Sequence, residues 1–256
     1  MHSVTMRQHD GVMKSNNKHA IGLIDDRTSS DESSDASSSC ELVESRNDGP
    51  VKASFVHTYR KPCMPSRTSY VAMDCEMVST TCGLEVARVV LVDWKGRTVL
   101  DTFVKPTYPV TDYLTFISGI VEADLKEAPG FADVRNDVRN AIYGKILVGH
   151  GLENDLAALQ LQHPWWLTRD TAYYQPFMQR RECNGEAIYV PRRLKDLCKE
   201  KLNKDIQHVG KAHCPAEDAQ SALDLYKTHR PRWERCVTVT IRNQRRFARQ
   251  QDPYSY

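Results

Sequence analysis

The chain has 256 residues, enough for one sizeable domain with flanking segments or for two small domains. Its formal net charge of +2 is nearly neutral and says little about partners, and no apolar run approaches the ~18 residues that a membrane span requires. There is no N-terminal apolar run typical of a signal peptide, and the eight cysteines include no CxxC pair. We therefore expect an intracellular protein with reduced thiols and no membrane partner.

The beginning of the chain lacks the regular hydrophobic spacing of a helix or a strand. Residues 27–50, RTSSDESSDASSSCELVESRNDGP, are rich in serine and acidic side chains. They contain too few apolar groups to offset the entropy cost of ordering the chain. We predict that residues 1–66 form a disordered tail.

Three β-rich runs follow the tail: YVAMDCEMV at 70–78, VARVVLVDW at 86–94 and TVLDTFVKP at 98–106. The connections between them are short, and the second contains the turn sequence WKGR. Short connections between consecutive strands are typical of an antiparallel meander.

Helices and further strands alternate beyond the meander. Residues 131–142 carry apolar side chains at helical spacing and precede Gly144, a suitable residue to end a helix. The sequence KILVGH at 145–150 predicts a short buried strand, and three more helices are predicted over 152–162, 191–203 and 214–229. Together with the meander, these elements predict an α/β domain in which helices flank a mixed sheet.

Two acidic side chains interrupt the first apolar strand. Because successive side chains on a strand point to opposite faces, Asp74 and Glu76 share one face. Two carboxylates at that spacing repel each other, and burial increases the cost of charging them. Either a cation neutralises them, or the segment is an exposed edge strand and the pairing has no chemical meaning.

Further acids lie near the starts of two predicted helices. Asp155 follows the strand KILVG and falls in the first turns of the next helix, where the helix dipole favours a negative charge. Asp218 lies about one turn into a helix that begins near Pro215, on the side that carries Ala222 and Leu225. An acid on the apolar side of a helix is costly unless it is paired. Alternatively, either acid could have no chemical role and simply stabilise the start of its helix.

A histidine precedes the second of these acids. His213 lies five residues before Asp218 in a predicted loop, and its ordinary pKa suits a general base, although a surface histidine is the default interpretation. Oxygen ligands favour Mg²⁺ or Mn²⁺. If the four acids meet, they could hold two such ions on a scissile phosphate while His213 accepts a proton from the attacking water. The four predicted metal ligands are Asp74, Glu76, Asp155 and Asp218.

Three sequences carry a family resemblance. The motifs MDCEMV, GHGLENDL and HCPAEDAQSALDLY, in this order, resemble the three exonuclease motifs of the DEDD superfamily. A histidine five residues before the last aspartate resembles the pattern of the DEDDh branch of this superfamily. The intervening VKPTYPVTDYLTFISGI and HPWWLTRDT resemble the group of RNA exonuclease 4, interferon-stimulated exonuclease and apoptosis-enhancing nuclease. The resemblance covers about residues 69–233 and neither end of the chain.

The resemblance implies a fold and an activity. The implied fold is ribonuclease H-like, a mixed five-stranded sheet whose first three strands are antiparallel. The implied activity is 3′ to 5′ hydrolysis of single-stranded RNA or DNA, which releases nucleoside 5′-monophosphates with two Mg²⁺ or Mn²⁺ ions. Asp74, Glu76, Asp155 and Asp218 match the metal ligands, and His213 matches the general base.

Other positions match the group's substrate-binding residues or depart from its pattern. Met77 and Leu152 match positions that pack against the terminal nucleotide, although a role in the core is the alternative for either. Residues 111–119 resemble a loop on the substrate side. The family often has glycine after DCEMV and a longer, acid-containing loop before the Ala-Arg pair, whereas here the shorter STTCGLEVAR begins with Ser79. Leu114 stands where the group usually has arginine, which puts substrate affinity or preference in doubt.

These inferences divide the chain into the tail of residues 1–66, an exonuclease domain over 67–235 and a basic C-terminal tail over 236–256. Residues 227–256 contain eight lysines and arginines against two acids, which suits a phosphate backbone or nuclear import, with a plain solvated charged tail as the alternative. This basic end and the family resemblance together indicate a nuclear or nucleolar location. Beyond residue 233 we expect either a short strand or unstructured chain.

The expected partner is single-stranded nucleic acid, with RNA favoured over DNA, and no obligate protein partner is inferred. Two alternatives stay open: a DNA-directed exonuclease in stress or apoptotic DNA degradation, and a catalytically silent nucleic-acid-binding scaffold.

Overall fold

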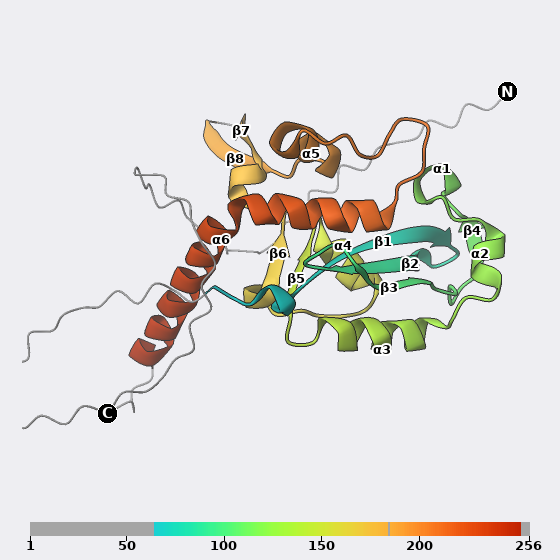
Figure 1. Ribbon diagram of the computed structural model, residues 1–256, viewed down its shortest axis with the longest axis horizontal. Helices are drawn as coiled ribbons and strands as arrows, with labels where there is room; N and C mark the ends of the chain where they lie inside the picture. Colours follow the sequence, from blue (N-terminus) through green and yellow to red (C-terminus); the bar gives the residue numbers. More distant parts are fainter. Residues whose placement is uncertain (1–63, 184, 252–256) are drawn as a thin grey trace, which may run out of the picture. The chain divides into compact units, whose positions relative to one another are not determined.

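A computed structural model describes residues 64–183 and 185–251 of the chain (Figure 1). Nearly all of the predicted N-terminal tail lies outside these residues, so its disorder stays a prediction. Within the described part of the chain, no helix combines the length and the apolar content needed to cross a bilayer.

In the described part of the chain four strands come first, three helices follow, and the remaining strands and helices are interspersed. The strands are β1 (Tyr70–Thr80), β2 (Gly83–Asp93), β3 (Thr98–Phe103), β4 (Val110–Asp112), β5 (Ile146–Gly149), β6 (Thr168–Asp170), β7 (Gln179–Cys183) and β8 (Glu186–Val190). The α-helices are α1 (Thr115–Ser118), α2 (Glu122–Lys126), α3 (Phe131–Ile142), α4 (Leu152–Ala158), α5 (Leu194–Leu202) and α6 (Pro215–Gln251). Short 3₁₀ turns are η1 (Arg67–Ser69), η2 (Trp165–Leu167) and η3 (Gln175–Phe177).

The main sheet has the strand order β3-β2-β1-β5-β6, and the short β4 pairs with the far end of β1. Strands β1, β2 and β3 pair antiparallel, whereas β5 runs parallel to both β1 and β6. This is the predicted mixed sheet with an antiparallel meander at its start, but the added pairing of β4 with β1 makes it six-stranded rather than five-stranded. Strands β7 and β8 form a separate two-stranded hairpin.

Side chains of β1 alternate between two apolar cores, one on each face of the sheet. Tyr70 and Ala72 pack with apolar residues of α5 and α6, whereas Val71 and Met73 pack with those of α3 and α4. Figure 1 shows α5 and α6 on one side of the sheet and α3 on the other. The alternation predicted from the sequence therefore decides which helix layer each side chain of β1 meets.

Helix α6 is longer than the sequence predicts. It begins at Pro215, as predicted, but continues to Gln251 through Pro231, near which the ribbon bends (Figure 1). The prediction of a short strand or unstructured chain beyond residue 233 is therefore wrong. Trp233 and Val237 are buried against the core and Ile241 packs beside them, a spacing of four that matches a helix.

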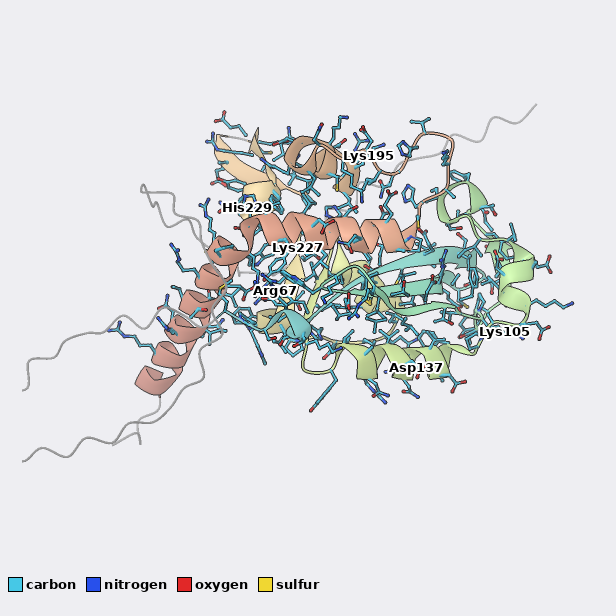
Figure 2. The ribbon with its side chains drawn as sticks, viewed as in Figure 1. Arg67, Lys105, Asp137, Lys195, Lys227 and His229 are labelled. Carbon is cyan, nitrogen blue, oxygen red and sulfur yellow. The ribbon has the colours of Figure 1, made fainter. Side chains whose placement is uncertain are left out.

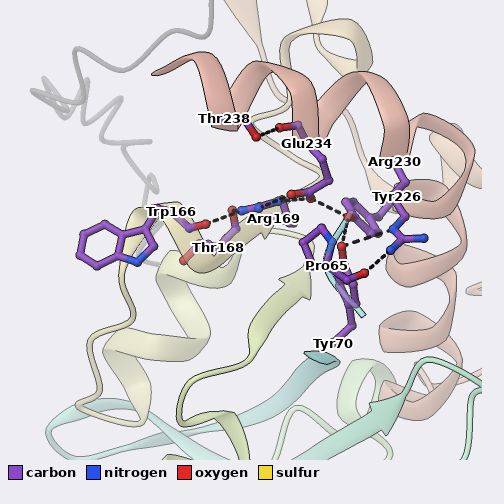
Figure 3. A network of polar contacts seen from close by, with 9 residues as sticks. All are labelled: Pro65, Tyr70, Trp166, Thr168, Arg169, Tyr226, Arg230, Glu234 and Thr238. Atoms are coloured by element: carbon purple, nitrogen blue, oxygen red, sulfur yellow. Dashed lines mark hydrogen bonds and ion pairs between the residues drawn. The ribbon is translucent and has the colours of Figure 1, made fainter. Parts of the chain in front are cut away.

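A buried ion pair fastens β6 to this long helix (Figure 3). The guanidinium of Arg169 donates to both carboxylate oxygens of Glu234, at 2.7 and 2.8 Å, and both side chains are almost completely buried. Arg169 also donates to the backbone oxygens of Trp166 and Thr168, and the hydroxyl of Tyr226 donates to Glu234 at 2.6 Å. This saturation with hydrogen bonds is what makes a buried ion pair tolerable.

Candidate active site

The two acids of β1 lie where the strand changes partners. On one side β1 pairs with β2 along its length; on the other it pairs with β5 over 70–72 and with β4 only at 79–80. Asp74 pairs with Val90 and Glu76 with Arg88 in the register with β2, so both point to the face that α6 covers. Glu76 is 6% exposed, which rules out the exposed-edge interpretation.

Asp155 reaches this gap from the start of α4. The turn after β5 needs Gly149, because a Cβ there would lie 2.4 Å from Leu152 Cδ2 and 3.0 Å from the backbone oxygen of Met73. Gly151 then adopts a left-handed φ of +80° before the helix begins. The carboxylate of Asp155 is 5% exposed and accepts hydrogen bonds from Cys75, in the part of β1 that lacks a partner strand on this side.

Asp170 fixes the start of α4. It lies at the end of β6, and its two carboxylate oxygens accept from the backbone N–H groups of Gly151 and Leu152, each at 2.8 Å. These N–H groups have no partner within the helix, so Asp170 acts as an N-terminal cap supplied by another strand. Our sequence analysis did not include Asp170 among the site residues. The segment HPWWLTRDT was noted only for its family resemblance, and no strand was predicted there, so no local pattern pointed to Asp170.

Asp218 approaches the same place from the first turn of α6 and is 3% exposed. Its Oδ2 accepts a hydrogen bond from Gln207 Nε2 at 2.9 Å and lies 3.9 Å from His213 Nδ1. The backbone N–H of His213 donates to the backbone oxygen of Ile117 at 2.7 Å, which ties the histidine loop to α1. The half-buried His213 therefore lies beside Asp218, as its position five residues earlier suggested.

The electrostatics show that the acids crowd one another. Burial raises the pKa of Asp74 well above its ordinary value, and the charges of Asp155, Asp218 and Glu76 raise it further. Burial also raises the pKa of Glu76 to about 8, with Asp218 adding to the rise and Arg88 opposing it.

The two helix acids behave in the same way. Burial raises the pKa of Asp155 to about 7, although hydrogen bonds from Cys75 oppose the rise. Burial raises the pKa of Asp218 too, against the hydrogen bond from Gln207 and the charge of His213. Four carboxylates from three elements therefore resist ionisation unless positive charge comes close to them.

These residues fit a divalent metal site in their chemistry. All four acids supply hard oxygen ligands, and Asp218 Oδ1 is buried with no hydrogen-bond partner in the structure. Among residues 64–183 and 185–251, however, no three His, Cys, Asp or Glu side chains form a finished metal-binding group. The four acids are near enough to influence one another's pKa values, but in this structure they do not form an assembled metal site.

The two positions predicted to bind substrate differ in exposure. Met77 is half-buried on β1, directly after the register shift that follows Glu76. Leu152 is 1% exposed and packs in the core between the sheet and α3, as the core alternative suggested. It offers a nucleotide little surface, so a substrate-binding role for Leu152 stays a prediction.

The sheet order, the flanking helices and the acidic site define a ribonuclease H-like exonuclease fold. Two solved structures share it. The Neurospora crassa Pan2 catalytic unit aligns with a TM-score of 0.55 and 24% identity, over 71% of this chain and 30% of that one. A Saccharomyces cerevisiae Pan2 exonuclease module in complex with AAGGA RNA aligns with a TM-score of 0.53 and 27% identity, over 72% of this chain and 33% of that one.

Residues 71–226 match the exonuclease family described as RNase_T, and the chain belongs to that family. Exonucleases of this kind generally depend on divalent metal ions. The chain is 43% identical over 169 residues to RNA exonuclease 4 of Mycosarcoma maydis, covering 65% of this chain and 44% of the relative.

A second relative, interferon-stimulated 20 kDa exonuclease-like 2 of Bos taurus, is 36% identical over 192 residues. That match covers 73% of this chain and 54% of the relative. The chain thus spans about half the length of these two curated relatives.

Proposed function

We propose that the chain is a 3′ to 5′ exonuclease that shortens single-stranded RNA and releases nucleoside 5′-monophosphates. The observation that carries this proposal is the meeting of four carboxylates from β1, α4 and α6 beside His213, with pKa values raised by burial and mutual repulsion. Acids whose pKa values are strongly perturbed by burial and by one another cluster at functional sites. The names of the relatives, RNA exonuclease 4 in particular, support RNA as the substrate.

The four acids would hold two Mg²⁺ or Mn²⁺ ions. Asp74 and Glu76 come from a rigid central strand, whereas Asp155 and Asp218 come from the first turns of two helices. When bound, the ions would lower the pKa of the attacking water and stabilise the leaving oxygen. The protein's part is to keep these ligands in place and to shield them from bulk water, which the burial of Glu76, Asp155 and Asp218 accomplishes.

His213 would move the proton. Its Nδ1 faces Asp218 Oδ2, so Nε2 is the nitrogen that we assign to accept a proton from the water that attacks the terminal phosphodiester. The bond from phosphorus to the O3′ atom of the preceding nucleotide breaks. The shortened strand then keeps a 3′ hydroxyl, and the released nucleotide carries the phosphate on its 5′ oxygen.

Two further assignments belong to this proposal. Met77, half-buried beside Glu76, would contact the terminal nucleotide. The concentration of lysine and arginine in residues 227–256 supports a nuclear or nucleolar location, where a polyanionic substrate is abundant.

A gel time course tests the activity. The full chain is incubated with 5′-labelled single-stranded RNA and DNA of one sequence, in Mg²⁺, in Mn²⁺ and in EDTA. Asp74→Ala is the test variant. Asp137→Ala is the matched control, because Asp137 is exposed on α3 on the far side of the sheet (Figure 2).

We expect a ladder that shortens from the 3′ end, faster on RNA, absent in EDTA and in Asp74→Ala, and normal in Asp137→Ala. Faster shortening of DNA would reassign the substrate. No shortening of either strand in either metal would refute the exonuclease and leave a nucleic-acid-binding scaffold.

A further inference from the structure

Gln207 is held in an unusual backbone conformation beside the acidic site. It lies in the loop between α5 and α6 with a left-handed φ of +52°, which side chains with a Cβ rarely adopt. Its neighbour Ile206 is buried in the core with Ala219 and Ala222 of α6, so the loop is anchored immediately before the strained residue. A strained residue of this kind persists only where its surroundings impose the conformation.

The side chain of Gln207 forms a hydrogen bond with Asp218, one of the four acids of the site. The amide nitrogen Nε2 donates to Oδ2 of the carboxylate at 2.9 Å, while the other oxygen, Oδ1, is buried with no partner. The two oxygens of one carboxylate are thus treated differently. One is occupied by a neutral donor, and the other is available to an ion.

The side chain of Asp218 needs such a contact to keep one orientation. The terminal torsion of an aspartate has broad, roughly two-fold minima, so the helix backbone alone does not decide which oxygen points where. His213 Nδ1 lies 3.9 Å from Oδ2, beyond hydrogen-bond distance. Gln207 therefore supplies the hydrogen bond that selects one orientation.

We infer that Gln207 is a positioning residue that orients Asp218 so that Oδ1 is presented to a divalent ion. This inference rests on the proposed function, because it assigns Asp218 as a metal ligand. In this assignment Gln207 contacts Asp218 and would not itself be a ligand of the ion. Partners that orient a ligand in this way typically change metal affinity by about 10- to 100-fold when they are removed.

The test measures metal binding directly. The full chain is stripped of metal and titrated calorimetrically with Mn²⁺, for the wild type, Gln207→Met and Gln207→Gly. Methionine keeps the length of the side chain but cannot donate a hydrogen bond. Glycine also removes the donor, and it adopts the left-handed backbone conformation without strain. The matched control is Gln220→Met, which removes a 2.7 Å hydrogen bond from another glutamine to Asp224 on the same helix.

We expect the Kd for Mn²⁺ to rise at least about 10-fold in both Gln207 variants and to stay within about two-fold of wild type in Gln220→Met. The metal-free unfolding midpoint of Gln207→Gly should stay close to that of the wild type, which a purely structural role would not predict. The Mn²⁺ concentration for half-maximal RNA shortening should rise in parallel, with the rate recovering at saturating Mn²⁺.

Other outcomes separate the inference from the proposed function. If the wild type binds Mn²⁺ and shortens RNA but both Gln207 variants bind Mn²⁺ equally well, the inference fails and the function stands. Equal losses in Gln220→Met, or failure of both Gln207 variants to fold, would also overturn it in favour of a general structural role. A wild type that neither binds Mn²⁺ nor shortens RNA would remove both.

Discussion

Replacing Glu76 by glutamine should change how the stability of the metal-free protein depends on pH. Glu76 is buried on β1 among the other acids, and its pKa is raised from 4.5 to about 8. In the folded state this carboxyl keeps its proton up to about pH 8, whereas in the unfolded chain it loses the proton above pH 4.5. The folded state therefore binds more protons across this interval, and stability falls as the pH rises through it.

The magnitude follows from the two pKa values. Relative to low pH, where the carboxyl is protonated in both states, the raised pKa of Glu76 lowers the free energy of unfolding by about 1 kcal/mol at pH 5 and by about 4 kcal/mol at pH 8. Between these two pH values Glu76 alone therefore accounts for a loss of about 3 kcal/mol in stability. Glutamine has nearly the same shape and does not ionise, so this share disappears. The pKa values of Asp74, Asp155 and Asp218 are also raised. The stability of the variant should therefore still fall as the pH rises, but less than that of the wild type.

The assay is urea unfolding of metal-free wild type and Glu76→Gln at pH 5, 6, 7 and 8. The free energies of unfolding of the two proteins should diverge as the pH rises. Between pH 5 and pH 8 the stability of the variant should increase by about 3 kcal/mol relative to that of the wild type. Excess Mn²⁺ at pH 8 should stabilise the wild type more than the variant, because the variant lacks one ligand. Identical pH dependence in the two proteins would refute the description of Glu76 as a buried acid that ionises at a cost.

Three further predictions concern other parts of the molecule. His213→Ala should lower turnover by about 10²- to 10⁴-fold while Mn²⁺ binding, measured by calorimetry, stays normal; an unchanged rate would remove the histidine from the mechanism. Arg169→Met should cost about 3–5 kcal/mol in urea unfolding because it leaves Glu234 buried without its cation, and a loss below about 1 kcal/mol would contradict this. Val237→Ala should cost about 2 kcal/mol by the same method, whereas Val209→Ala, at a position 99% exposed, should cost less than about 0.5. Equal effects of the two valine variants would mean that α6 beyond residue 233 does not belong to the core.

Local patterns in the sequence were sufficient for much of the fold and for the acids. The period of two in YVAMDCEMV placed Asp74 and Glu76 on one face, and the register with β2 agrees. Pro215 indicated the start of α6 and hence the place of Asp218 in its first turn. Strand alternation and helix-start preferences act within a few residues, which is why they can be read from the chain directly.

The segment after residue 233 shows where local preference fails. The sequence CVTVTI is rich in β-branched residues, which favour strands, yet it is helical in α6. Val237 and Ile241 pack on the core one helical turn apart, beside Trp233. Burial of these side chains outweighs an intrinsic preference that is worth less than about 1 kcal/mol per residue.

Contacts between distant segments determined the rest of the site. The amino-acid sequence is sufficient to show which acids are present and which face of β1 carries two of them. Only the tertiary structure decided that β1 lacks a second partner strand where Asp155 arrives, that Asp170 caps α4, and that Gln207 holds Asp218. These contacts join segments whose meeting depends on strand order and on the packing of helices over the sheet. No short-range periodicity encodes them, because their free energy arises only when the whole sheet has assembled.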